Sequence, residues 1–231
     1  MVEISKKDVE RGLILPKEHS KELAEFLGIL TGDGYMGHYR KYDYIVEISG
    51  NQLLDCEYIE NYLSNLVKNL FNIKGCIIKR TDQNTMFMRI RSKGLFFYLK
   101  EIGFKGGYKN RIGIPVWITK NRKFLIFFIR GLFDTDGTLS LKNRNMKIYP
   151  VVSISSKSDL LMKKVQKFIK VEGISSHLAK DILKDKRYKK TPIVFRLQIN
   201  GYKNCKSWID LIGSNNPRIL SKYKKANIEV D

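Results

Sequence analysis

The sequence has few cysteines, and their number is odd. Its 231 residues include only Cys56, Cys76 and Cys205, which lie far apart and form no C-x-x-C motif. This spacing argues against a zinc site and against a disulfide framework. The three histidines show no metal-ligand spacing either. We therefore expect three packing thiols and no cysteine or histidine metal site.

Long hydrophobic runs are also absent. The longest, FLIFFI at 124–129, has six residues, whereas a membrane-spanning helix needs about 18 or more. The first residues, MVEISKKDVERG, lack the apolar stretch of a signal peptide. We therefore expect an intracellular protein, cytoplasmic or organellar, that is not secreted and has no membrane partner.

Acidic residues are scarce beside basic ones. Lysine and arginine total 43 against 23 aspartates and glutamates, which gives a net charge of +20 distributed along the whole chain. A charge of this size favours a folded surface that binds a polyanion such as nucleic acid. Composition alone leaves open a lysine-rich soluble enzyme. The 43% hydrophobic content is sufficient for one large domain or two small ones.

Two stretches of the chain resemble each other. FLGILTGDGYMG begins at residue 26 and FIRGLFDTDGTLS at residue 128, and aligning them places Asp33 on Asp136. The segments that follow each stretch also match. The sequence therefore predicts two similar halves. The expected divisions are an N-terminal segment 1–21, repeats at 22–112 and 122–221 joined by a linker 113–121, and a tail 222–231.

Hydrophobic periodicity predicts the same element order in each half. Apolar residues from Leu23 to Leu30 recur at helical spacing, and we expect Gly34 and Gly137 to end the two helices that carry the acids. IVFRLQIN at 193–200 alternates like a strand with one solvated face. The predicted fold is α+β, with two pseudo-symmetric αββαββα repeats. Each repeat contributes a four-stranded antiparallel sheet backed by helices.

Three interpretations of the glycine–acid stretches fit poorly. Gly32, Gly34 and Gly37 spell a dinucleotide-binding G-x-G-x-x-G, but that fold needs a strand before the glycines, and here a helical stripe precedes them. DTDGT resembles the motif of haloacid-dehalogenase-type phosphatases, with Asp134 as nucleophile, yet the first copy has Thr31 there. An EF-hand loop that begins at Asp134 would need glutamate where Asn145 stands. The phosphatase stays a distant alternative.

A fourth interpretation explains both copies through small residues at helical spacing. Gly28 and Gly131, each followed by a small residue four positions later, allow two helices to pack with their backbones close together. Their C-terminal ends would then bring Asp33 and Asp136 together. Two carboxylates repel each other there, at the negative ends of two helix dipoles, unless divalent cations lie between them. Mg²⁺ suits such a site and promotes phosphodiester hydrolysis.

FLGILTGDG and IRGLFDTDG resemble the paired motifs of the LAGLIDADG homing endonucleases in their single-chain, two-motif form. The resemblance covers about residues 22–221, although Thr31 departs from the motif. It implies a pseudo-twofold monomer with two saddle-shaped sheets, joined at the motif helices, that straddle double-stranded DNA and read a long site. It also implies intron homing through Mg²⁺-dependent cleavage of both strands, with short 3′ overhangs. Mn²⁺ is expected to substitute.

The resemblance also implies roles for particular residues. Asp33 and Asp136 are the expected catalytic and metal-binding acids, Gly32 and Thr135 complete the expected metal site, and Gly28 and Gly131 form the helix interface. Lys93 is our match for the family's supporting lysine. From strand alternation and basic loops, the predicted DNA-binding residues are Arg40, Lys79, Arg80, Arg89, Arg91, Lys142, Arg144, Lys180, Arg187, Arg196 and Gln198.

Two other functions are compatible with the same fold. One is an RNA-binding intron maturase, whose partner is its own intron RNA. The other is a DNA-binding protein whose catalysis has decayed, although both motif acids are present here. The chain lacks the ends of a splicing element, so we expect it to be free-standing.

Overall fold

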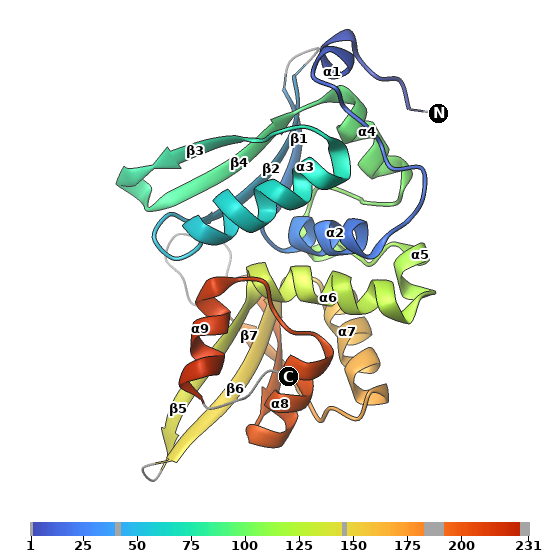
Figure 1. The fold of residues 1–231 in the computed structure, drawn as a ribbon. Coiled ribbons are helices and arrows are strands. Elements are labelled where there is room, and N and C mark those ends of the chain that lie inside the picture. Colours follow the sequence, from blue (N-terminus) through green and yellow to red (C-terminus); the bar gives the residue numbers. More distant parts are fainter. Residues whose placement is uncertain (1, 40–42, 145–146, 183–191, 227–231) are drawn as a thin grey trace.

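The computed structural model describes residues 2–39, 43–144, 147–182 and 192–226. Two similar halves lie one above the other, with helices α2 and α6 side by side between them (Figure 1). The predicted α+β fold with two αββαββα repeats is confirmed. None of the helices in these ranges is both long and apolar enough to cross a membrane.

The first half is built on one antiparallel sheet, with strand order β1-β2-β4-β3. The short α1 (Lys6–Glu10) precedes the repeat, and within the repeat the π-helix η1 runs directly into α3. The elements of the repeat are α2 (Lys21–Asp33), β1 (Gly34–Tyr39), β2 (Asp43–Asn51), η1 (Tyr58–Leu63), α3 (Ser64–Phe71), β3 (Cys76–Arg80), η2 (Thr81–Gln83), β4 (Thr85–Arg91) and α4 (Lys93–Glu101).

The second half repeats this order, with strands β5-β6-β8-β7. The segment between the halves contains the single turn η3 (Lys109–Arg111) and the short α5 (Val116–Thr119). The elements of the second half are α6 (Arg122–Asp136), β5 (Gly137–Arg144), β6 (Lys147–Ser156), α7 (Asp159–Val171), β7 (His177–Ile182), β8 (Ile193–Asn200), α8 (Tyr202–Leu211) and α9 (Pro217–Lys225).

Each sheet has one apolar face and one polar face. On β4, the side chains of Met86, Met88 and Ile90 are buried against the helices, whereas Arg89 and Arg91 lie on the other face. Successive strand residues point to opposite faces, so this alternation fixes the strand register. The polar faces of both sheets are therefore left without a covering layer of helices.

The two motif helices meet backbone to backbone. A Cβ atom added to Gly28 would lie 2.0 Å from the carbonyl oxygen of Phe128, and one added to Gly131 would lie 2.2 Å from that of Glu25. Real Cβ atoms do not approach backbone this closely, so any side chain at these positions forces the helices apart. Gly28 and Gly131 thus lie at the crossing of α2 and α6.

We expect Gly28→Ala to lower the free energy of unfolding by about 3 kcal/mol or more. The added methyl group meets rigid backbone, which places the cost at the upper end of overpacking effects. Gly113→Ala is the matched control, because its added Cβ would meet only the Leu160 side chain, at 4.0 Å. Urea denaturation measures both variants. Equal midpoints for Gly28→Ala and wild type would show that the helices do not meet there.

Gly34 and Gly137 end the motif helices, but not by a left-handed turn. Both backbones are extended, with φ of −83° and −97°. A Cβ at Gly34 would lie 2.3 Å from the carbonyl oxygen of Leu30, and one at Gly137 equally close to that of Phe133. Glycine is required for space here, since the chain turns directly from helix into strand.

Candidate functional site

Asp33 and Asp136 are the last residues of α2 and α6, and lie where the two helices meet. Burial raises the pKa of Asp136 to about 7, and the nearby charge of Asp33 adds to the effect. Burial also raises the pKa of Asp33, and Lys109 opposes this rise. The structure therefore brings together two desolvated carboxylates that repel each other, one from each half.

Lys109 is the cation of this site. It lies in η3, and its ammonium group donates a hydrogen bond to the carbonyl oxygen of Gly32. Its charge lowers the pKa of both Asp33 and Asp136. The sequence did not single out Lys109, since it lies 77 residues from Gly32 along the chain and no local motif surrounds it.

Lys93, the predicted supporting lysine, is not at this site. It begins α4 and forms an ion pair with Glu3, 2.8 Å away, and Tyr44 contributes to its raised pKa. Ser49, by contrast, donates a hydrogen bond to the carbonyl oxygen of Asp33 at 3.2 Å. Tyr44 and Ser49 are five residues apart on β2, about 16 Å at the rise of a strand. Lys109 therefore replaces Lys93 in our assignment.

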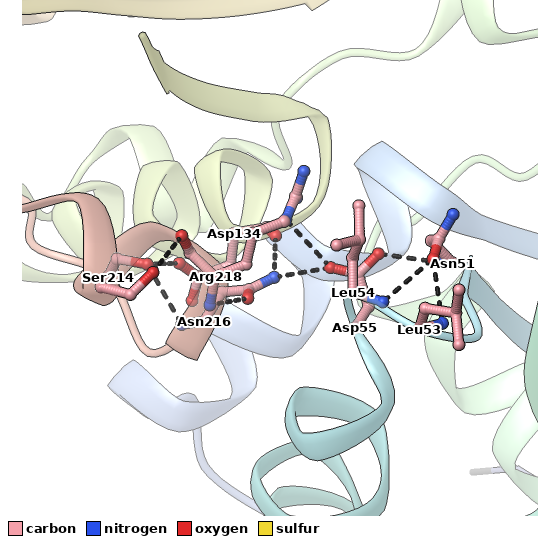
Figure 2. Close-up of polar contacts among 9 residues, drawn as sticks. Asn51, Leu53, Leu54, Asp55, Asp134, Ser214, Asn216 and Arg218 are labelled. Carbon is pink, nitrogen blue, oxygen red and sulfur yellow. Dashed lines mark hydrogen bonds and ion pairs between the residues drawn. The ribbon is translucent and has the colours of Figure 1, made fainter. Parts of the chain in front are cut away.

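A buried polar network joins Asp134, Asn216 and Asp55 (Figure 2). These three residues line one small cavity together with Asp33. Asp134, 1% exposed, accepts hydrogen bonds from the hydroxyl of Ser214 and, at 3.0 Å, from the backbone N–H of Asn215. Asn216 donates to the carbonyl oxygen of Asp134 at 2.9 Å and to the Asp55 carboxylate at 3.1 Å. The network therefore holds the loop before α9 against the first half of the molecule.

This environment rules out the phosphatase interpretation. Burial raises the pKa of Asp134 to about 7, and hydrogen bonds from Ser214 and Asn215 engage its carboxylate. A nucleophile needs access to substrate, and Asp134 has none. Both sheets are antiparallel, with no parallel pairing among the described strands. Asp134, the first acid of DTDGT, is therefore a structural residue.

Asp55 and Arg218 connect the polar network to Asp33. Arg218 Nε lies 3.2 Å from Asp55 Oδ1, and both residues act on Asp33: Asp55 raises its pKa and Arg218 lowers it. Asp55 also accepts the N–H of Asn51 at 3.0 Å, which fixes the turn after β2. Neither residue was predicted, because Asp55 lies outside the motif and Arg218 comes from the other half.

The donor set fits Mg²⁺. Two oxygen-only carboxylates face each other, and this hard cation is commonly held by one or two carboxylates plus water and substrate phosphate. No cluster of three or more acidic, histidine or cysteine side chains suited to a metal forms among the described residues. Of the other predicted ligands, the Gly32 carbonyl accepts from Lys109, and the Thr135 hydroxyl donates to backbone carbonyls of its own helix.

Most of the predicted DNA-contacting side chains lie on the polar sheet faces. Arg89 pairs with Glu47 at 2.5 Å, Arg91 with Asp43 at 3.3 Å, and Arg196 with Asp181 at 2.8 Å. These cross-strand pairs hold the guanidinium groups on the sheet. The residues of the predicted set whose strand register places them on this face are Arg80, Arg89, Arg91, Lys142, Arg196 and Gln198.

Two of the predicted DNA contacts lie on the wrong face. Lys79 is opposite the buried Met86 and pairs with Glu60 of η1 at 2.7 Å. Lys180 is opposite Phe195, whose side chain packs on the core. The alternation of polar and apolar residues predicted the correct face on the long strands. The short edge strands contain too few alternating residues to show which side chains lie on the polar face. Arg40 and Arg187 lie outside the described residues, and only the backbone of Arg144, in β5, is described.

We expect Asp136→Asn to stabilise the metal-free protein at pH 8 by roughly 2–4 kcal/mol. A carboxyl whose pKa rises from 3.8 to about 7 on folding stabilises the folded state while it is protonated. That contribution is lost as pH rises through about 7. The advantage of the variant should therefore shrink toward pH 4. Urea denaturation in EDTA at both pH values measures it, and a variant less stable than wild type at pH 8 would contradict the assignment.

Comparison with known proteins finds a family match within the second half. Residues 123–213 match the family model of the LAGLIDADG-like domain. Uncharacterized protein MJ0314 of Methanocaldococcus jannaschii is 26% identical over 172 residues, which cover 74% of this chain and 60% of that protein. The DNA polymerase of Thermococcus hydrothermalis is 27% identical over 162 residues, 68% of this chain but 9% of the polymerase. The match thus spans only part of each relative.

Solved structures show the same fold over both halves. The homing endonuclease I-DmoI in complex with DNA and Ca has a TM-score of 0.59 at 20% identity, covering 89% of this chain and 97% of that chain. I-DmoI in complex with DNA and Mn gives 0.57 at 21% identity, covering 84% and 96%. I-WcaI bound to its DNA recognition sequence gives 0.55 at 14% identity, covering 98% and 94%.

Proposed function

We propose that the chain is a site-specific double-strand DNA endonuclease of the LAGLIDADG family, in the form with two motifs on one polypeptide. One observation carries the proposal. Asp33 and Asp136 come from different halves and meet at the ends of two packed helices, with Lys109 beside them. A pseudo-symmetric carboxylate pair suits a substrate with two antiparallel strands, because each strand presents a scissile phosphate to one half.

The carboxylates, Lys109 and the polar sheet faces would each have a separate role. The two carboxylates would hold Mg²⁺, or Mn²⁺ in its place, and the bound metal would supply an activated water and stabilise the leaving oxygen. The Lys109 ammonium lies close enough to lower the pKa of both acids, so it would also stabilise negative charge that develops on the phosphate. The polar sheet faces would read the flanking major grooves of a long site.

The family resemblance supplies the finer features of the proposal. A monomer would cleave across the minor groove and leave short 3′ overhangs, and its biological role would be intron homing. The RNA-binding maturase and the catalytically decayed DNA-binding protein are the rival functions. Retention of both acids, desolvated and facing each other, favours the enzyme, since the pair is costly to keep without a metal.

Incubation with Mg²⁺ and a plasmid library of candidate insertion sites tests the proposal. We expect linear product from particular plasmids, no product in EDTA, and sequenced ends that carry 3′ overhangs at a single position. Failure to cut any plasmid, together with tight binding of structured intron RNA, would instead identify a maturase.

A further inference from the structure

The amino-terminal segment is a fixed part of the first half. Asp8 of α1 is only 2% exposed, and its carboxylate accepts hydrogen bonds from the N–H of Gly94 at 2.9 Å and the hydroxyl of Ser5 at 2.8 Å. Leu13, just after α1, is buried in the core. These contacts hold α1 at the start of α4, beside the outer ends of the first-half strands (Figure 1).

A basic cleft lies between α1 and the sheet. It encloses 830 Å³, and five of its lining residues are cationic: Lys6, Lys7, Arg11, Arg91 and Lys93. The acids in its lining already have partners, since Asp8 is bound as above and Asp43 pairs with Arg91. Across the described ranges, no acidic side chain forms an ion pair with the exposed Lys6, Lys7 or Arg11.

The cleft lies at the outer end of the first sheet. The Arg11 guanidinium donates to the carbonyl oxygen of Arg91 at 2.6 Å, which aligns α1 with the outer end of β4. Arg91 lies on the polar face, so the cleft continues that face outward. Asp43 lines the cleft, and Ser49, six residues further along β2, lies beside the catalytic pair. The distance from the cleft to the catalytic pair is therefore about 20 Å along the strand, which equals about six base pairs of duplex.

The segment before the second motif helix differs from the one before the first. The element that precedes α6 is α5, whose sequence VWIT contains no basic residue. Among the described elements, a basic helix such as α1, KKDVE, therefore precedes only the first motif helix.

We propose that this cleft binds the sugar–phosphate backbone of DNA beyond the sheet footprint on the first-half side. The inference rests on the proposed function. Fixed lysines and arginines on a surface continuous with the reading face suit phosphates, which fix register without carrying sequence information. The closely spaced phosphates of a duplex would supply the counter-charge that the chain does not.

Salt dependence of binding tests the inference with Lys6→Ala/Lys7→Ala, whose two side chains are exposed. On the plasmid-derived target, we expect the slope of log affinity against log salt to fall in magnitude by about 2. For the wild-type protein, a duplex shortened to six base pairs from its centre on the first-half side should show the same decrease in slope. A duplex shortened equally on the second-half side should not. Lys164→Ala/Lys167→Ala on α7, away from the polar face, is the charge-matched control.

Each outcome bears on the inference. Unchanged slopes in the Lys6/Lys7 variant, or equal losses on trimming either side, would overturn it even if wild type cleaves normally. Lost affinity for structured RNA with DNA binding intact would assign the cleft to RNA and also overturn it. A wild type that binds duplex DNA no better at low salt than at high salt would overturn the proposed function as well.

Discussion

Asp33→Asn and Asp136→Asn are each expected to lower the rate of double-strand cleavage by about 10³-fold or more and to leave DNA affinity within a few-fold of wild type. Asparagine keeps the shape of the side chain but removes the charge that holds the metal, and metal ions supply several kcal/mol of transition-state stabilisation. The two acids meet at one place, so loss of either should affect both strands. Linearisation of supercoiled target plasmid over time measures the rate.

The matched control for these variants is Asp210→Asn. Asp210 is a half-exposed residue of α8 that pairs with Lys206, so its substitution removes the same charge at a distance from the motif helices. A motif variant that linearises plasmid at the wild-type rate would refute the catalytic assignment. A motif variant that unfolds would also contradict it, since removing either charge relieves repulsion.

Lys109→Met should reduce the cleavage rate by about 10²–10³-fold, the usual range for loss of a group that stabilises charge developing in the transition state. Methionine keeps the length of the side chain but provides no charge and no donor for the Gly32 carbonyl. In the variant, the pKa values of Asp33 and Asp136 lose the cation that lowers them. The pH–rate profile should therefore shift to higher pH, which a purely structural role would not produce.

Lys170→Met is the control for this variant. Lys170 lies in the last turn of α7, on the side of the second sheet away from the polar face, and carries the same charge. Single-turnover cleavage across pH 6–9 compares the two variants with wild type. A Lys109→Met enzyme with the wild-type rate and profile would exclude this lysine from the chemistry.

Much of the fold could be predicted because its signals are local. The apolar stripe of α2, the alternation of β4 and β8, and the duplicated motif each lie within one short window of sequence. The acids could be placed for the same reason, since Asp33 and Asp136 are part of the motif itself. Their pairing required one further inference, that small residues at helical spacing mark a helix crossing.

The rest of the site depends on tertiary contacts that no local pattern records. Lys109 reaches Gly32 from a single helical turn that follows α4, whereas Lys93 was chosen only for its place after the fourth strand. Arg218 reaches Asp55 across the two halves. Asp134 belongs to a motif-like sequence, yet its burial depends on Ser214 and Asn215 from a distant loop.

Anomalous scattering from Mn²⁺ in crystals of the protein bound to its target DNA tests the central claim most directly. We predict that the anomalous peaks lie between the carboxylates of Asp33 and Asp136 and the two scissile phosphates. Mn²⁺ bound instead at Asp55 or Asp134, or the absence of any peak at the ends of α2 and α6 in a complex that cleaves on warming, would contradict the account.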